Sequence, residues 1–383
     1  MISETLKESE WVLAWREKRM EEAGVLPTSI KHGIAISALF PETEPDYAET
    51  AQYHVDATKG IEIYTWKEAM MQEEVEPILK GLMESVFFPV AKDHFRALGQ
   101  ATFRSGLVVY VQPNMKDDGT FVTEKLTLDT IVPTNTSADI IVVILKEGAL
   151  CDLTSNLSGG GAGSMHARTL VILSEQEAQV CVSQTNATAS GAMVMHQSRG
   201  VIAGHGKVIW RELLTGDVLV SSVTDNLLIG VGASATVLQG IVAGAHAVFD
   251  VDVSAAHSAS DTVSLIKTAG TATDVSRVLY RGLVNMEHGV RAVRGEQEAK
   301  FLVLSPTAKI DAIPSLDIAS NDVHCAHKLS VSHVRAGDLF YPKLRGLSDE
   351  ESRTLFLEGH FGHVFAGDEN ADMMNLILPK TAK

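Results

Sequence analysis

Between about residues 103 and 333 the sequence consists of short apolar or alternating segments separated by Gly, Asn, Asp and Ser. Some segments are continuously apolar, as strands buried on both faces are, and others alternate with a period of two. Few of the intervening stretches carry the 3.6-residue period of a helix, which disfavours a sheet of alternating strands and helices. The pattern therefore predicts a long β array. Its segments include 107–111, 140–145, 169–173, 179–182, 218–223, 248–253 and 301–304.

Part of this array shows a loose internal repeat of aliphatic residues, a polar corner, a small residue and a second strand. No strict hexapeptide or ankyrin-like period is present, and one of the three matches needs a one-residue insertion. The corner chemistry nevertheless fits a β solenoid, in which each coil stacks on its neighbours and the ends need covering. The three stretches are 142–153 around Ala149, 170–182 around Ala178 and 302–312 around Ala308.

Helical patterns occupy the beginning of the chain. Glu10–Ala23 carries tryptophans at helical spacing and ends at Gly24, as a helix C-terminus commonly does. Thr65 and Glu68 fit a capping box, which predicts the start of a second helix. Pro77 is expected to kink or end that helix, because proline lacks the backbone N–H of a helix interior.

A helical pattern returns after His333, where Ser348 and Glu351 fit another capping box. The sequence therefore predicts three regions. They are a mainly helical N-terminal region at 1–92, a β-solenoid core at 93–335 and a C-terminal helical region at 336–383.

Composition limits the possible partners and location. The 383 residues are 45% hydrophobic but 6% aromatic, which favours an aliphatic, repetitive core. A formal charge of −16, without clustered Lys and Arg, argues against nucleic acid as a ligand. No signal peptide is visible in residues 1–10, and no apolar stretch reaches the roughly 18 residues of a membrane span. We therefore expect a cytoplasmic protein with no membrane partner.

Two side chains that can bind metals, Cys325 and His327, lie two residues apart on an expected strand, so they should share one face. A thiol and a neutral imidazole are ligands for iron and other soft or borderline metals. His324 should point to the opposite face. The alternative for Cys325 is a small buried hydrophobe, and Cys151 and Cys181 are more readily core residues than members of a sulfur relay.

Several motifs in 302–361 resemble the SufB/SufD family of iron–sulfur cluster assembly proteins, and SufD more than SufB. A weaker match is 95–103, where the family has a short helix that enters its β core. The motifs are Pro314–Ile318, Asp322–His327, and Leu339-Phe340-Tyr341 with Arg345-Gly346-Leu347.

The resemblance implies a right-handed parallel β-helix with helical ends, which pairs with a SufB-like protomer or with a second copy of itself. It also implies a transient iron–sulfur cluster, with [4Fe–4S] as the expected type, held at the protomer interface with His327 and Cys325 as ligands. The C-terminal region would bind the ATPase SufC. The docking residues would be Leu339, Phe340, Tyr341, Arg345, Gly346 and Leu347.

The chain itself is then expected to be a non-catalytic scaffold subunit. Its glycine-rich run at 158–164 lacks the Lys-Ser/Thr ending and the following helix of a phosphate loop, so a separate subunit must supply ATPase activity. A structural solenoid without a ligand remains an alternative. A β-helix enzyme acting on polysaccharide is another, although such an enzyme should show secretion, exposed aromatics and paired carboxylates.

The chain also departs from the family pattern. SufB offers glutamates on both sides of its histidine, where this chain has Ala326 and Lys328. Ala308 occupies the apparent position of a functional SufB cysteine, and Pro342 follows the Phe-Tyr pair where the family continues with an aliphatic residue. The sequence thus carries about half of a ligand set.

Overall fold

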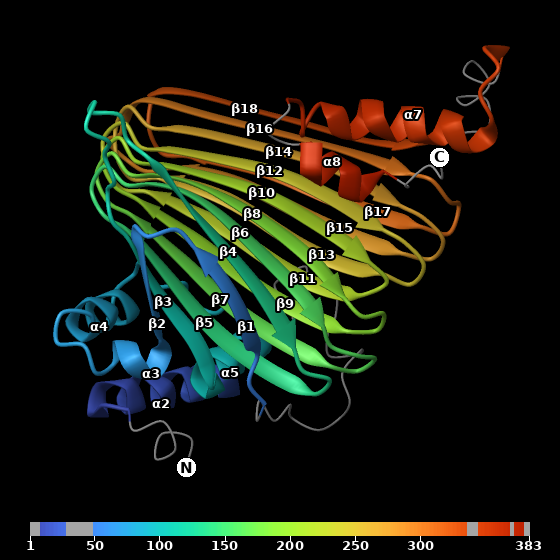
Figure 1. Cartoon of the computed structure of the whole chain (residues 1–383). Coiled ribbons are helices and arrows are strands. Elements are labelled where there is room, and N and C mark those ends of the chain that lie inside the picture. The colour runs from blue at the N-terminus through green and yellow to red at the C-terminus, as the bar shows by residue number, and fades with distance from the viewer. Residues whose placement is uncertain (1–7, 28–48, 335–343, 368–370, 379–383) are drawn as a thin grey trace.

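The computed structural model describes residues 8–27, 49–334, 344–367 and 371–378. Two sheets, each of nine strands, face each other and form a parallel β solenoid of about seven turns (Figure 1). From β3 onward, successive strands alternate between the two sheets, and each strand pairs with the strand two positions away in sequence. The prediction of a mainly β solenoid is confirmed.

One sheet contains the even-numbered strands and is called the even sheet. In spatial order its strands are β1 (Gln52–Ala57), β4 (Thr123–Val132), β6 (Leu150–Gly159), β8 (Gln179–Thr188), β10 (Lys207–Gly216), β12 (Ser234–Ala243), β14 (Val263–Ala272), β16 (Arg291–Val303) and β18 (Asp322–His333).

The other sheet, the odd sheet, runs in spatial order from the last coil to the first. Its strands are β17 (Lys309–Ile318), β15 (Arg277–Met286), β13 (Val248–His257), β11 (Leu219–Leu228), β9 (Met193–Ile202), β7 (Met165–Ser174), β5 (Thr136–Leu145), β3 (Ser105–Val111) and β2 (Ile61–Thr65).

The coils differ slightly in length, which explains why the sequence shows no strict period. Strands β6, β8 and β10 begin at residues 150, 179 and 207, so one coil takes 29 residues and the next takes 28. Ala149, Ala178 and Ala308 are buried at equivalent corners. The amide of Ala149 donates to the carbonyl of Lys146 at 2.9 Å, and the other two alanines make the same contact with residues three positions earlier. The loose repeat in the sequence therefore corresponds to a corner that recurs in successive coils.

The lumen between the sheets is filled mainly by aliphatic side chains from alternate positions of every strand. Four large aromatic residues are also fully buried there: Trp210, Phe249, Tyr280 and Phe301. Each buried aliphatic side chain contributes about 1.5 to 3 kcal/mol, so stacking the coils supplies most of the stability.

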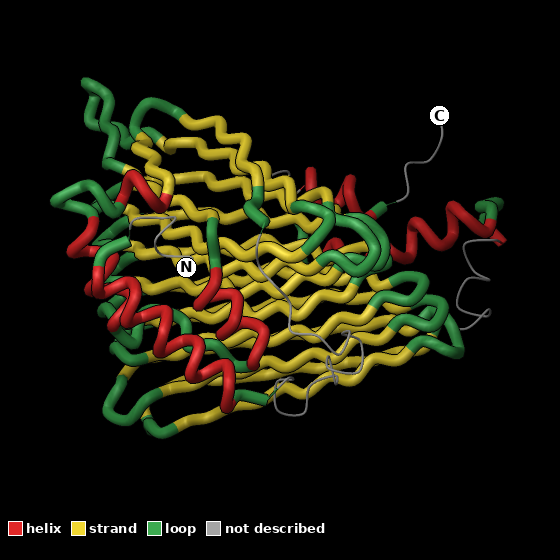
Figure 2. Tube along the Cα trace, turned by 90° about the horizontal axis from the view of Figure 1, so that it is seen from below, coloured by secondary structure: helices red, strands yellow, loops and turns green. Residues whose placement is uncertain are grey.

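The N-terminal region covers the first coil. Its helices are α2 (Glu10–Val25), α3 (Trp66–Ala69), α4 (Glu76–Glu84) and α5 (His94–Thr102). Seen from below, helices lie across the strands at this end (Figure 2). Strands β1 and β2 pair antiparallel with β4 and β3, and they occupy the outer edges of both sheets.

The expectation of a mainly helical N-terminal region therefore missed two strands. They arise because the first edge of each sheet has unpaired backbone groups, and a short antiparallel strand satisfies them. Pro77 begins α4 instead of ending a helix, because a proline in the first turn loses no helical hydrogen bond. The capping box of Thr65 and Glu68 is confirmed.

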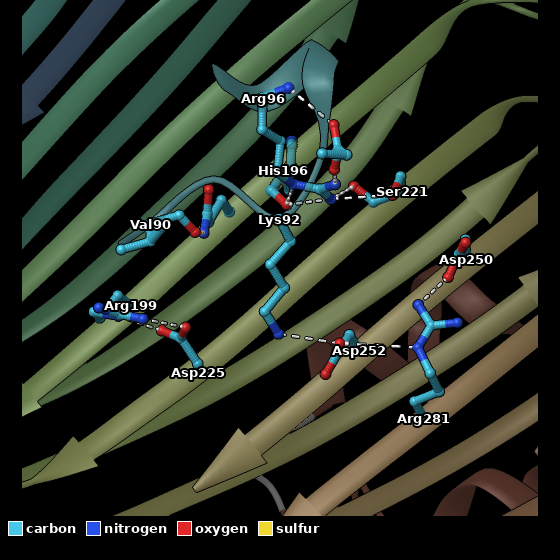
Figure 3. Close-up of polar contacts among 12 residues, drawn as sticks. Val90, Lys92, Arg96, His196, Arg199, Ser221, Asp225, Asp250, Asp252 and Arg281 are labelled. Atoms are coloured by element: carbon cyan, nitrogen blue, oxygen red, sulfur yellow. Dashed lines mark hydrogen bonds and ion pairs between the residues drawn. The ribbon is translucent and has the colours of Figure 1, made fainter. Parts of the chain in front are cut away.

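Helix α5 and the residues just before it are attached to the outer face of the odd sheet by charged side chains (Figure 3). The Arg96 guanidinium donates to the carbonyls of Ser221 at 2.7 Å and His196 at 3.1 Å. Lys92 forms an ion pair with Asp252 at 3.1 Å. These contacts join the N-terminal cap to strands β9, β11 and β13.

The C-terminal helices are α7 (Asp349–Gly362) and α8 (Ala371–Ile377). They pack on the outer face of the even sheet, where Phe361, Phe365 and Met373 form an apolar cluster with Leu213 and Ala269. The predicted capping box at the start of α7 is confirmed. Within the described ranges, no helix is long and apolar enough to span a membrane.

A buried ion pair lies inside the first coils. Arg168 donates to both carboxylate oxygens of Asp139, at 3.0 and 2.6 Å, and also to Thr130. Burial alone would raise the pKa of Asp139, but the charges and hydrogen bonds of Arg168 and His166 outweigh it and hold that pKa well below its usual range. A buried pair of this kind is costly to break, because the remaining charge has no solvent.

We expect Arg168→Met to lower the free energy of unfolding by about 3 to 5 kcal/mol. The depressed pKa of Asp139 stabilises the wild type above the unfolded carboxyl pKa of about 3.9, and this contribution is lost as pH falls below it. In the variant, burial should raise the same pKa, so the contribution of Asp139 should reverse sign. Denaturant unfolding over the range from about pH 2 to pH 7 measures both effects.

Lys300→Met is the matched control, because the ion pair between Lys300 and Glu298 is partly exposed to solvent and should contribute less than about 1 kcal/mol. The same dependence of stability on pH in wild type and Arg168→Met would contradict the assignment.

Candidate functional site

The two ends of the solenoid differ. At the N-terminal end, β1 and β2 complete the sheets. At the other end, β18 pairs along one edge with β16, and β17 along one edge with β15. In the part of the chain that the structure describes, no strand covers their outer edges. We call the surface formed by β17 and β18 the open end.

Cys325 and His327 both lie on β18 and face the lumen at the open end. Their register partners on β16 are Gly295 and Gln297, which occupy inward, buried positions. Cys325 packs against the core, whereas His327 is exposed because no further coil lies above it among the described residues. His324 is paired with an exposed residue and faces outward. The alternation expected from the sequence is therefore present.

Partial burial affects the chemistry of the thiol. Burial raises the pKa of the Cys325 thiol, and a hydrogen bond involving the Ala326 backbone partly offsets this. The thiol is thus protonated at neutral pH in the isolated chain. Because the thiolate is the form that binds metal, iron binding at this position must release a proton.

The site is incomplete within one chain. Among the described residues, no group of three or more His, Cys, Asp or Glu side chains is placed to hold a metal ion. Cys325 and His327 together offer two ligands, whereas tetrahedral iron–sulfur or zinc sites commonly require four.

The other two cysteines lie far from the open end in the sheet order, on β6 and β8. Cys151 faces the lumen and is buried, and burial raises its pKa to about 12. Cys181 is half-buried, and burial likewise raises its pKa. The position of Cys151 agrees with the prediction of a core residue, whereas Cys181 faces outward between the inward Val180 and Val182 and is not part of the core. Neither thiol is activated.

Only some of the expected docking residues lie in the part of the chain that the structure describes. Leu339, Phe340 and Tyr341 lie outside the described residues. Arg345 and Gly346 are exposed and Leu347 is half-buried, just before the capping box of α7. Gly346 has a φ of 91°, a left-handed conformation that favours glycine.

Sequence reasoning missed Gln297, the buried neighbour of His327. A Gly-x-Gln on one strand and a Cys-x-His on another give no sign that they are adjacent. Only the register of β16 and β18 brings them together, and deriving that register from the sequence would require the unequal coil lengths.

The fold and its open end define a class: a parallel β solenoid, covered at its N-terminal end, that presents a thiol and an imidazole on its last described strand. Residues 130–360 match the family model described as SUF system FeS cluster assembly, SufBD core domain. The chain belongs to the SufB/SufD family of iron–sulfur cluster assembly proteins.

Named relatives agree with this assignment. The chain is 25% identical over 346 residues to an iron–sulfur cluster assembly SufBD family protein of Staphylococcus saprophyticus subsp. saprophyticus, covering 90% of this chain and 72% of the relative. A protein of the same description from Staphylococcus aureus is 26% identical over 334 residues, covering 83% of this chain and 70% of the relative.

Proposed function

We propose that this protein is a SufD-like, non-catalytic scaffold subunit on which a transient iron–sulfur cluster is assembled. The observation that carries the proposal is the open end. There an edge strand carries two metal-binding side chains, Cys325 and His327, which form only part of a ligand set. The Cys-x-His spacing is the pattern of SufD-like sequences, and the glutamates of SufB are absent. The cluster is cargo, with [4Fe–4S] as the expected type.

The open end supports a second protomer as the source of the missing ligands. Its inward apolar side chains lack a covering layer among the described residues: Ile318, Leu329 and Val331 are 44%, 37% and 40% exposed. Their backbone edges can add strands from another chain, which would extend both sheets and bury these side chains. We propose a SufB-like protomer as the partner. A second copy of this chain would instead bring two Cys325 and His327 pairs near one axis.

The C-terminal region, 336–383, is proposed to dock a SufC-like ATPase. Support comes from the family motif at Leu339, Phe340 and Tyr341, and from the exposed Arg345 and Gly346 beside Leu347. The cluster formed by Phe361, Phe365 and Met373 anchors α7 and α8 to the even sheet. ATP-driven movement of this region would thus reach the solenoid directly.

His327→Ala should lower cluster yield at least tenfold in the reconstituted complex, because it removes an iron ligand while leaving an exposed position on an edge strand. The yield is measured by anaerobic iron and sulfide analysis, and thermal unfolding confirms that the variant folds. His324→Ala is the matched control, since His324 lies on the same strand but faces outward. An unchanged yield for His327→Ala would remove the proposed role.

The double variant Leu329→Lys with Val331→Lys should abolish pairing, because joining the two solenoids would bury unpaired charges in the lumen. Sedimentation of the chain, alone and after co-expression with a SufB-like protomer, gives the mass and identifies the partner. Ser330→Lys, between them on the outward face, should pair normally. Equal association of both variants would argue against pairing through the open end.

Phe340→Ala should weaken ATPase binding at least tenfold, a loss expected for one large apolar anchor at an interface. Titration of the ATPase by calorimetry or co-purification measures it. Met71→Ala removes an exposed apolar side chain of the N-terminal region and should have no effect. Unaltered binding by Phe340→Ala would exclude this motif as the docking site.

A further inference from the structure

Gln297 lies in a well-defined buried environment, one coil below the open end. It lies on β16, faces the lumen and is 2% exposed. Its side-chain nitrogen donates across the lumen to the hydroxyl of Tyr280 on β15, at 3.5 Å. The Thr268 hydroxyl donates to the same Tyr280 oxygen at 3.3 Å. The amide nitrogen of Gln297 therefore has a fixed partner.

The opposite sheet leaves room for this amide. A Cβ atom built on Gly282 would lie 1.7 Å from the Gln297 side-chain nitrogen, so no other residue fits at position 282 while Gln297 keeps this conformation. The absence of a side chain at Gly282 and the hydroxyl of Tyr280 together hold the Gln297 amide across the lumen.

The other end of the amide has no partner. The side-chain oxygen of Gln297, Oε1, is buried and accepts no hydrogen bond from the described residues. An unpaired acceptor in a closed apolar lumen destabilises the fold, so a donor at this position is expected when the site is in use.

The next coil offers few donors. The inward positions of β17 carry Ile, Ala, Pro, Leu and Ile, which have no side-chain donor. On β18 the inward residues are Val323, Cys325, His327, Leu329, Val331 and His333. Three of them, Cys325, His327 and His333, can donate a hydrogen bond, and His333 lies six positions further along the strand than His327. His327 is the register partner of Gln297, and neighbouring strands are about 4.8 Å apart.

We propose that Gln297 is a positioning residue for His327: its side-chain oxygen accepts a hydrogen bond from one imidazole N–H and leaves the other ring nitrogen unprotonated to bind iron. The inference rests on the proposed role of His327 as a ligand. Metal-binding histidines commonly donate their second N–H to such an acceptor, which fixes both the tautomer and the ring orientation.

The tautomer can be read directly in the full-length chain by NMR with ¹⁵N-labelled histidine at pH 8, with His327→Ala used to assign the signal. The wild type should show one tautomer of His327. Gln297→Met keeps the length and shape of the side chain but removes the acceptor, and should give a mixture. Gln297→Glu keeps an acceptor and should restore the single tautomer.

Glu296→Gln is the matched control, because Glu296 is the adjacent outward residue on β16 and should leave the tautomer unchanged. Thermal unfolding checks that every variant folds. A tautomer ratio that is the same in wild type and Gln297→Met would overturn the inference.

Cluster yield then separates this inference from the proposed function. Gln297→Met should lower iron affinity about 10- to 100-fold, as loss of such a partner does, and Gln297→Glu should recover most of it. If His327→Ala leaves the yield unchanged while the tautomer still depends on Gln297, the hydrogen bond stands but the ligand role fails. If His327→Ala abolishes the yield and the tautomer ratio is the same in wild type and Gln297→Met, only the positioning role fails.

Discussion

The unbroken parallel register between successive coils is the constraint on which the molecule depends. Because each residue lies beside its equivalent in the coil below, side chains at equivalent positions point inward or outward together in every coil. A shift of one residue in any coil would turn its apolar side chains to solvent. The register also places His327 beside Gln297, so the stacking that stabilises the core sets the geometry of the site.

Most of the charged groups in the lumen have a partner of opposite charge or a hydrogen-bonding neighbour. Arg168 neutralises Asp139 in the first coils. Further along, Glu212 accepts hydrogen bonds from Thr224 at 2.7 Å and Gln239 at 2.8 Å, although burial still raises its pKa. Gln297 differs in having one end of its amide paired and the other free. Asn186 on β8 also has one amide end without a partner, but Gln297 is the one that lies beside the last described coil.

Much of the architecture could be predicted from local sequence. Short segments with period two are specific to strands, and capping boxes such as Ser348 with Glu351 have fixed spacing, so both were identified correctly. Strands β1 and β2 were not predicted, because they form by pairing with β4 and β3, which lie much further along the sequence. The shared face of Cys325 and His327 followed from alternation, whereas the neighbour of His327 depends on coil lengths that no local pattern specifies. The functional roles of these residues, and of the docking motif, stay predictions.

A solenoid with two bare ends would be a monomer for polymerisation, since each end could add to the other without limit. Here β1 and β2 cover the first coil in antiparallel orientation, so the N-terminal end does not reproduce the parallel edge that the next molecule would need. If two molecules pair through their open ends, as proposed, the pair has no open end left to which a third molecule could add. The cap formed by β1 and β2 would thereby limit the proposed assembly to a finite pair and prevent a fibre.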